Sequence, residues 1–286
     1  MHWFLYAITG SILVGVFVAL FKIPAHKGYK SLPVLLFSFL TSGIVAIGLF
    51  HNAFPLTSVG VLVCAFLWGL SFAVASAVQM HALRHVDVAV LSPLTASLAL
   101  SVSVVIGIFF FHDPISISAW SGITLVILAI LFLSEKKEKD ERSFFGAGFL
   151  FVLVIVALGV FGTFLVKYET VHYSIQAIQL YQYFFAMLMT GLLIPITKQH
   201  REGKITKKDC VDAAPWGIAL GLLSVVGGYL MYLSFQAGPF AIVNAINSLY
   251  IIVTVIVAAV LFKEKLTKKR VLLVLVAVVA LVLMNF

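Results

Sequence analysis

Apolar stretches of about 20 residues follow one another along the whole chain, and short polar segments separate them. A helix needs about 20 apolar residues to cross the hydrocarbon core of a bilayer, so each stretch predicts a membrane-spanning helix. The predicted spans are 2–22, 32–51, 57–81, 88–111, 117–134, 144–167, 175–197, 214–234, 240–262 and 270–286. The connections leave no room for a soluble domain. The first span lacks a basic leader, which is typical of a retained helix rather than a signal peptide.

Composition supports this interpretation. Of the 286 residues, 62% are hydrophobic and 10% are charged, whereas about 25% are charged in a soluble domain. The net charge of +8 could suggest nucleic acid as a partner. The Lys and Arg residues, however, form short clusters between apolar stretches, as in the loops of membrane proteins. We therefore expect the lipid bilayer, and no nucleic acid, as a partner.

The distribution of positive charge predicts the orientation. Of the 19 Lys and Arg residues, 18 lie in the odd-numbered loops, and the even-numbered loops hold only Lys167. Basic loops are retained on the cytoplasmic side. A multi-pass protein of the plasma membrane, with cytoplasmic odd-numbered loops and both termini outside, is the expected arrangement.

An internal repeat divides the chain into two halves. Residues 86–134 and 238–285 each contain a small turn, a span with polar residues in its first turns, a bend with a carboxylate and a final aliphatic span. The first repeat is 1–134, the charged linker is 135–142 and the second repeat is 143–286. Because five spans per repeat is an odd number, the second repeat enters the membrane inverted. The predicted fold is an all-α integral membrane protein with ten transmembrane helices in two inverted five-helix repeats, a design that places substrate between the halves.

Polar residues at membrane depth are the candidates for substrate binding, because an unpaired polar group in hydrocarbon is costly. Asn244, Asn247 and Tyr250 follow one another at intervals of three, so they share one face of the ninth span. Their repeat mates include Ser92 and Thr95 in the fourth span. The other candidates are Gln176, Gln179 and Tyr183 in the seventh span, Tyr229, Tyr232 and Gln236 in the eighth, and Trp68 and Gln79 in the third.

Each candidate also has a structural interpretation. Asn and Gln residues in membrane helices often join neighbouring helices by hydrogen bonds, and Tyr229 and Tyr232 could belong to an aromatic belt at the membrane surface. Gln182, three residues after Gln179, extends the stripe of the seventh span. Most candidates fall in the outer half of the second repeat, so we expect substrate contact mainly there.

Charged residues are absent from the middle of every predicted span. Lys22 and Lys167 close the first span of each repeat, and Glu169 is the expected partner of Lys167. A lining of amides, hydroxyls and aromatic rings suits a neutral or zwitterionic solute of metabolite size.

Residues 229–267, "YLMYLSFQAGPFAIVNAINSLYIIVTVIVAAVLFKEKLT", resemble the eighth to tenth helices of EamA-like members of the drug/metabolite transporter superfamily. "LSPL" at 91–94 and "FFHDPIS" at 110–116 match the first-half copy more loosely. The resemblance implies a small-metabolite carrier whose central cavity is lined mainly by the third, fourth, eighth and ninth helices. The predicted orientation departs from members of this family that keep their termini inside.

These patterns favour a secondary transporter of a small neutral or zwitterionic metabolite (amino acid-like, sugar or nucleoside) that works by alternating access. The alternative is a flippase for a lipid-linked or polyisoprenyl-phosphate substrate, which needs a basic phosphate clamp. A membrane scaffold would give the polar stripes no reason to converge. No nucleophile with an adjacent base, no metal cluster and no phosphate loop is recognisable, so we expect neither an enzyme nor a cofactor or metal site. A homodimer is left open.

Overall fold

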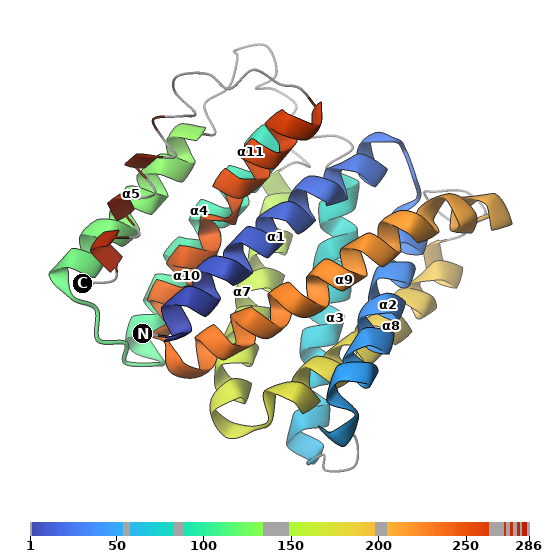
Figure 1. Cartoon of the computed structure of the whole chain (residues 1–286), viewed down its shortest axis with the longest axis horizontal. Coiled ribbons are helices and arrows are strands. Elements are labelled where there is room, and N and C mark those ends of the chain that lie inside the picture. The colour runs from blue at the N-terminus through green and yellow to red at the C-terminus, as the bar shows by residue number, and fades with distance from the viewer. Residues whose placement is uncertain are drawn as a thin grey trace.

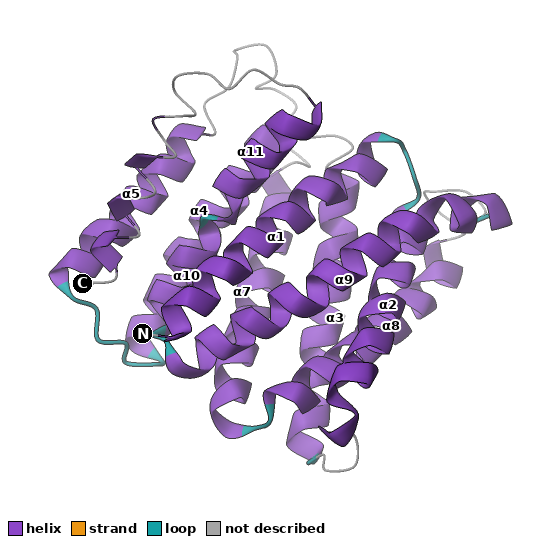
Figure 2. Ribbon diagram, in the orientation of Figure 1, coloured by secondary structure: helices purple, strands orange, loops and turns teal. Residues whose placement is uncertain are grey.

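The computed structural model describes residues 2–53, 58–82, 88–133, 149–197 and 205–262, together with helical residues 272, 275–276, 279–280 and 282–284. Every regular element in these parts of the chain is a helix (Figure 2). The first half of the chain contains α1 (His2–His26), α2 (Ser31–Phe50), the short 3-10 helix η1 (His51–Ala53), α3 (Val59–Ala82), α4 (Val88–Phe109) and α5 (Ile117–Leu133). The second contains α7 (Phe149–His172), α8 (Ile175–Thr197), α9 (Lys207–Ala237), α10 (Phe240–Ser248) and α11 (Tyr250–Phe262).

The all-α membrane fold predicted from the sequence is confirmed. In the described parts of the chain, six helices are long and apolar enough to cross a membrane. Nine of the predicted spans coincide with α1 to α5, α7, α8, α9 and the pair α10–α11. The tenth span holds the helical residues between 272 and 284. The predicted linker at 135–142 lies outside the described residues.

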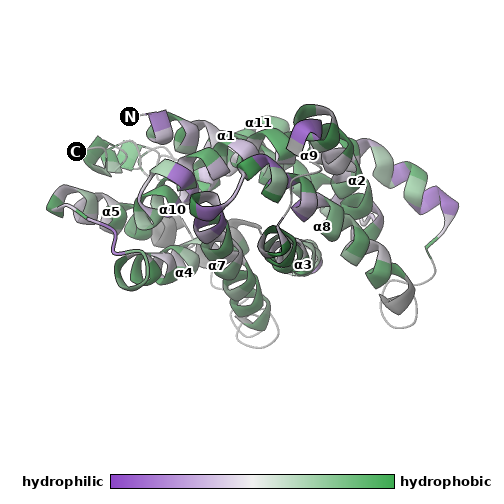
Figure 3. Cartoon of the chain, turned by 90° about the horizontal axis from the view of Figure 1, so that it is seen from below, coloured by the Kyte–Doolittle hydropathy of each residue, from purple (hydrophilic) through white to green (hydrophobic). Residues whose placement is uncertain are grey.

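The helices pack mostly between the two halves of the chain. The longest interfaces join α1 to α9, α2 to α9, α3 to α8, α2 to α8 and α3 to α7. In Figure 1, α1 and α9 run side by side across the front, α3 and α7 pass behind them, and α4 lies behind α10 and α11. Figure 3 shows that hydrophobic residues cover most of the bundle and that the N-terminal end of α9 is hydrophilic.

Several helices extend beyond their predicted spans, and α9 extends furthest. α9 begins at Lys207, because the Thr206 side chain caps the backbone N–H of Asp209 and the Asp209 carboxylate accepts the backbone N–H of Thr206. Asp209 also forms an ion pair with Lys30, with 2.9 Å between Nζ and Oδ2. α7 continues to His172, so Lys167 lies inside the helix rather than at its end.

The ninth span is interrupted at Leu249, which separates α10 from α11. An interruption leaves backbone carbonyls without their usual helical partners. The Ser11 hydroxyl of α1 donates to the carbonyl of Ile246, at 2.9 Å, and the Thr254 hydroxyl of α11 donates to the carbonyl of Gly15, at 3.0 Å. α1 therefore holds the interrupted span in place.

Candidate solute-binding site

A cavity of about 210 Å³ lies between helices of both halves of the chain. Helices α1, α3, α7, α8, α9 and α10 all contribute to its wall. Its lining consists of Val14, Phe17, Trp68, Phe72, Thr163, Val166, Gln182, Tyr183, Leu223, Ser224, Gly227, Gly228, Met231, Tyr232, Phe235 and Asn247. None of these residues carries a formal charge, and most of them come from the second half.

A chain of hydrogen bonds links three helices along the cavity wall. The Trp68 indole N–H of α3 donates to the hydroxyl of Tyr232 on α9, at 2.6 Å. That hydroxyl donates in turn to the Oε1 of Gln182 on α8. Because each group has its partner on another helix, the three side chains hold one another in fixed orientations.

Small residues make this arrangement sterically feasible. A Cβ atom at Gly162 of α7 would overlap the ring of Trp68, so the glycine leaves the space in which the indole lies. A Cβ atom at Gly69 of α3 would lie 2.7 Å from the backbone carbonyl of Gln182. Phe72 stacks against Trp68, with 5.5 Å between the ring centroids. Gly69 therefore allows α3 to approach α8 closely, and this contact positions Gln182.

Two further residues of α8 bind the backbone of α9. The hydroxyl of Tyr183 donates to the carbonyl of Ser224, at 2.7 Å, and lies 2.9 Å from the Ser224 hydroxyl. The side-chain amide of Gln179 donates to the carbonyl of Val225, also at 2.7 Å. A Cβ at Gly228 would lie 3.1 Å from the Tyr183 hydroxyl oxygen, so the glycine allows this approach. Gln179 joins the two helices here, whereas Tyr183 both joins them and lines the cavity.

The two asparagines of α10 have different surroundings. Asn244 is buried and its side-chain amide donates to the carbonyl of Phe240 in its own helix, at 2.9 Å. Asn247 lines the cavity, and its Oδ1 is buried with no hydrogen-bond partner among the described residues. An unpaired acceptor in a cavity wall can accept a hydrogen bond from a bound solute.

The remaining predicted site residues lie elsewhere. Tyr250 interacts with Thr95, whose hydroxyl also donates to the carbonyl of Leu91, away from the cavity. Gln176 and Tyr229 line a second, more open pocket at the ends of α2 and α8. Gln236 is exposed and Gln79 is half-buried, and neither lines the cavity; the side chain of Ser92 lies outside the described residues. Of the predicted set, the structure brings together Trp68, Tyr183, Tyr232 and Asn247.

Some cavity residues were missed as candidates. Gln182 carried a signal, because it extends the stripe of Gln179 by one turn. Ser224 and Thr163 had none, because single hydroxyls are frequent in membrane helices and usually bond to their own backbone. The side chains that approach them come from other helices and cannot be read from local spacing.

Lys167 and Glu169 do not form the expected pair. The Lys167 ammonium donates to the carbonyls of Phe235 and Gly238, at 2.8 Å each, at the end of α9. Neither carboxylate oxygen of Glu169 has a hydrogen-bond partner among the described residues. The expectation was wrong because residues two apart on a helix point to different sides.

Comparison with known proteins agrees with this architecture. The family model described as "EamA-like transporter family" matches residues 146–286. The second half of this chain is an EamA-like transporter domain. The resemblance drawn from residues 229–267 is thereby confirmed. The EamA-like domain supplies α7 to α11, and hence most of the cavity wall.

Relatives with assigned names cover both halves. The chain is 24% identical over 246 residues to a "Putative sugar uptake protein" of Listeria monocytogenes, covering 83% of this chain and 82% of that protein. It is also 24% identical over 252 residues to the "Putative sugar uptake protein YxfA" of Lactococcus lactis, covering 84% and 82% respectively. The chain is therefore similar, over most of its length, to proteins named for the uptake of small solutes.

A solved structure supports the fold. The chain superposes on a crystal structure of another protein with a TM-score of 0.73, over 98% of this chain and 94% of that chain. The two sequences are 11% identical. The chain thus has the same fold as that protein along almost its whole length.

Proposed function

We propose that this protein is a secondary transporter of a small uncharged polar solute, and that a sugar is the first candidate. The uncharged lining of the cavity carries the proposal. A charged solute would lose its hydration there without gaining a counter-ion, whereas a neutral polyol loses less and can be satisfied by hydroxyls and amides. The names of the two relatives support a sugar over an amino acid or a nucleoside.

The chemistry of the wall suits a sugar ring in two ways. Trp68 and Phe72 offer a broad aromatic surface that can cover the C–H face of a sugar. Asn247 offers its unpaired Oδ1 to a hydroxyl donor, and Ser224 lies at the same wall. A pocket that is mostly apolar with a few placed polar groups is the usual form of a small-molecule site.

Helix packing supports transport by alternating access between two inverted repeats. If α1, α2, α3 and α4 correspond to α7, α8, α9 and α10, the interfaces form matched pairs. α1 packs on α9 as α7 packs on α3, and α2 packs on α9 as α8 packs on α3. The α2–α8 and α4–α10 interfaces are their own mates. Rocking of one repeat against the other would expose the cavity between them to each side in turn.

The flippase alternative receives less support. A phosphate clamp needs basic side chains that are free to bind an anion. The lining residues carry no charge, and the Lys167 ammonium is engaged by two backbone carbonyls. We therefore favour a transporter of a small polar solute over a flippase for a lipid-linked substrate.

Uptake into proteoliposomes tests the proposal. Purified protein is reconstituted, and accumulation of radiolabelled D-glucose, D-ribose, leucine and uridine is compared with that of protein-free vesicles. We expect saturable uptake of a sugar. A Trp68→Leu variant should lose most of it, whereas Trp120→Leu, which changes an exposed tryptophan on α5, should retain it. Uptake of leucine or uridine alone would contradict the assignment of a sugar.

A further inference from the structure

Glu169 of α7 is a fully buried carboxyl group that the proposed solute site does not use. Its exposed fraction is 0%, and neither side-chain oxygen has a hydrogen-bond partner among the described residues. It does not line the cavity. Acidic side chains are rarely buried in membrane helices without a partner, and those that occur often carry protons.

The position of Glu169 connects it with the cavity. It lies one turn beyond Val166, a lining residue, and therefore on nearly the same face of α7. The thiol of Cys64 on α3 lies against it, one turn before Trp68. Tyr232 of α9, the central residue of the hydrogen-bond chain, interacts electrostatically with the Glu169 carboxyl.

Among the described residues, the other ionisable groups around Glu169 provide no counter-ion. His172, one turn further along α7, is exposed, and its Nδ1 lies 2.6 Å from the carbonyl of Tyr168. Lys167 of the same helix is bound to the carbonyls of Phe235 and Gly238 and interacts with Asp113, which follows α4. α4 itself contains no ionisable residue. On α8, Tyr183 is bonded to Ser224, and Tyr173, in the turn before α8, lies against Gly60 of α3.

Burial without a counter-ion decides the protonation state. An ionised carboxylate in this position would lose its hydration and gain at most the weak thiol donor of Cys64 in return, whereas the neutral acid loses much less. The group therefore holds a proton while it is enclosed. When rocking of the repeats admits water to the cavity, the ionised form becomes accessible. Protonation and opening of the cavity are thus thermodynamically linked.

We propose that Glu169 is the proton-binding residue of a proton-coupled transport cycle. This inference rests on the proposed function. The carboxylate takes a proton from water when the cavity is open on the side of high proton concentration, and the neutral acid returns it to water on the other side. One proton crosses with each solute, and no oxidant or reductant is involved. Tyr232, which contacts the cavity, is the link between the carboxyl and the solute.

Chemical labelling tests the protonation state without a solute. Dicyclohexylcarbodiimide adds to protonated carboxyl groups in apolar surroundings, and peptide mass spectrometry of the full-length protein locates the adduct. We expect an adduct at Glu169 whose yield falls by at least tenfold as the pH rises. Asp209, which is ion-paired with Lys30 at the start of α9, should stay unlabelled. No adduct at Glu169, or a yield independent of pH, would overturn the proposal.

Transport by variants tests the coupling. In proteoliposomes with an inward proton gradient, Glu169→Gln should lose gradient-driven accumulation of D-glucose and D-ribose by at least tenfold, yet still exchange labelled for unlabelled sugar. Glu169→Asp should recover part of the accumulation, and Asp209→Asn should behave as the wild type. Wild-type accumulation by Glu169→Gln would overturn the proposal. If wild-type protein carries neither sugar, the assignment of a sugar fails, and labelling still decides the role of Glu169.

Discussion

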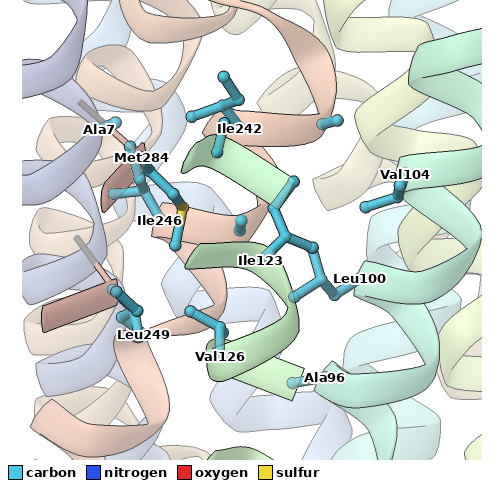
Figure 4. Packing of buried hydrophobic residues seen from close by; sticks show 14 of the residues in the cluster. Ala7, Ala96, Leu100, Val104, Ile123, Val126, Ile242, Ile246, Leu249 and Met284 are labelled. Carbon is cyan, nitrogen blue, oxygen red and sulfur yellow. The ribbon is translucent and has the colours of Figure 1, made fainter. Parts of the chain in front are cut away.

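Two regions on either side of α10 differ in whether their buried groups need hydrogen-bond partners. On one side, sixteen buried apolar residues form a cluster, to which α1, α4, α5, α10, α11 and helical residues near the C-terminus contribute. Figure 4 shows Leu100, Ile123, Val126, Ile242 and Ile246 of this cluster packed toward one another. On the other side, Asn247 of α10 faces the cavity with its hydrogen-bonded wall. The apolar cluster needs no partner for any group, whereas each polar group of the wall needs one, either from the protein or from a solute.

The comparison separates stability from transport. Changes in the apolar cluster should lower stability and leave the transport rate of folded protein unaltered. Changes in the cavity wall should act on transport first.

Gly69→Val should have the largest effect. Its side chain would collide with the backbone of α8 near Gln182 and Ala186, displacing the helix that carries Gln182 and Tyr183. Overpacking of this kind costs about 1–3 kcal/mol of stability, and we expect sugar uptake to be abolished. Gly191→Val on α8 is the matched control, because nothing lies within 4 Å of its added Cβ. Equal uptake by the two variants would show that the α3–α8 contact does not support the site.

Tyr232→Phe should reduce transport by about tenfold or more. The variant keeps the ring but leaves the Trp68 N–H and the Gln182 Oε1 without their partner. An unsatisfied buried group costs about 1–3 kcal/mol. Initial uptake rates in proteoliposomes measure the loss, and Tyr168→Phe, which changes an exposed tyrosine on α7, should retain the wild-type rate.

The two asparagines of α10 allow the effects on transport and on stability to be separated within one helix. Asn247→Leu removes an acceptor that has no protein partner, so we expect the KM for the sugar to rise about fivefold to tenfold, corresponding to about 1–1.4 kcal/mol, with little loss of stability. Asn244→Leu removes a bond within α10 and should lower the melting temperature while leaving the KM unchanged. A raised KM in Asn244→Leu with an unchanged KM in Asn247→Leu would contradict the assignment of Asn247 to the solute site.

Leu100→Ala should have the smallest effect on transport and a large one on stability. Leu100 is 1% exposed in the apolar cluster, and loss of a buried leucine side chain costs about 2–5 kcal/mol. Unfolding in mixtures of mild detergent and SDS measures this cost. Leu98→Ala, at an exposed position of the same helix, should be nearly neutral.

The spans were predictable because hydrocarbon thickness fixes helix length and the apolar stretches are continuous. The extension of α9 to Lys207 had a recognisable signal, the Thr206 and Asp209 of a capping box. The extension of α7 had none, because Lys167 is satisfied by carbonyls of α9 that lie about 70 residues away in the chain. Helical spacing grouped residues on one helix face, but it could not show which faces meet.

The same limit explains why only part of the candidate site could be predicted from the sequence. Spacing placed Asn244 and Asn247 on one helix face, yet Asn244 bonds to the backbone of its own helix whereas Asn247 lines the cavity. Trp68 and Tyr232 were separate candidates. Only the packing of α3 on α7 at Gly162 and on α8 at Gly69 places the Trp68 indole where it bonds to Tyr232 of α9. The burial of Glu169 likewise depends on α3 and α9 rather than on its own helix.

Fluorescence of a protein whose sole tryptophan is Trp68 tests most directly whether this cavity holds the solute. Replacement of Trp3, Trp120 and Trp216 by Phe leaves the indole of the cavity wall as the only reporter. Titration with the sugar that is taken up should change its emission saturably, with a dissociation constant that is raised by Asn247→Leu and unchanged by Asn244→Leu. Emission that stays constant at saturating sugar, in protein that still transports it, would contradict the assignment of this cavity as the site.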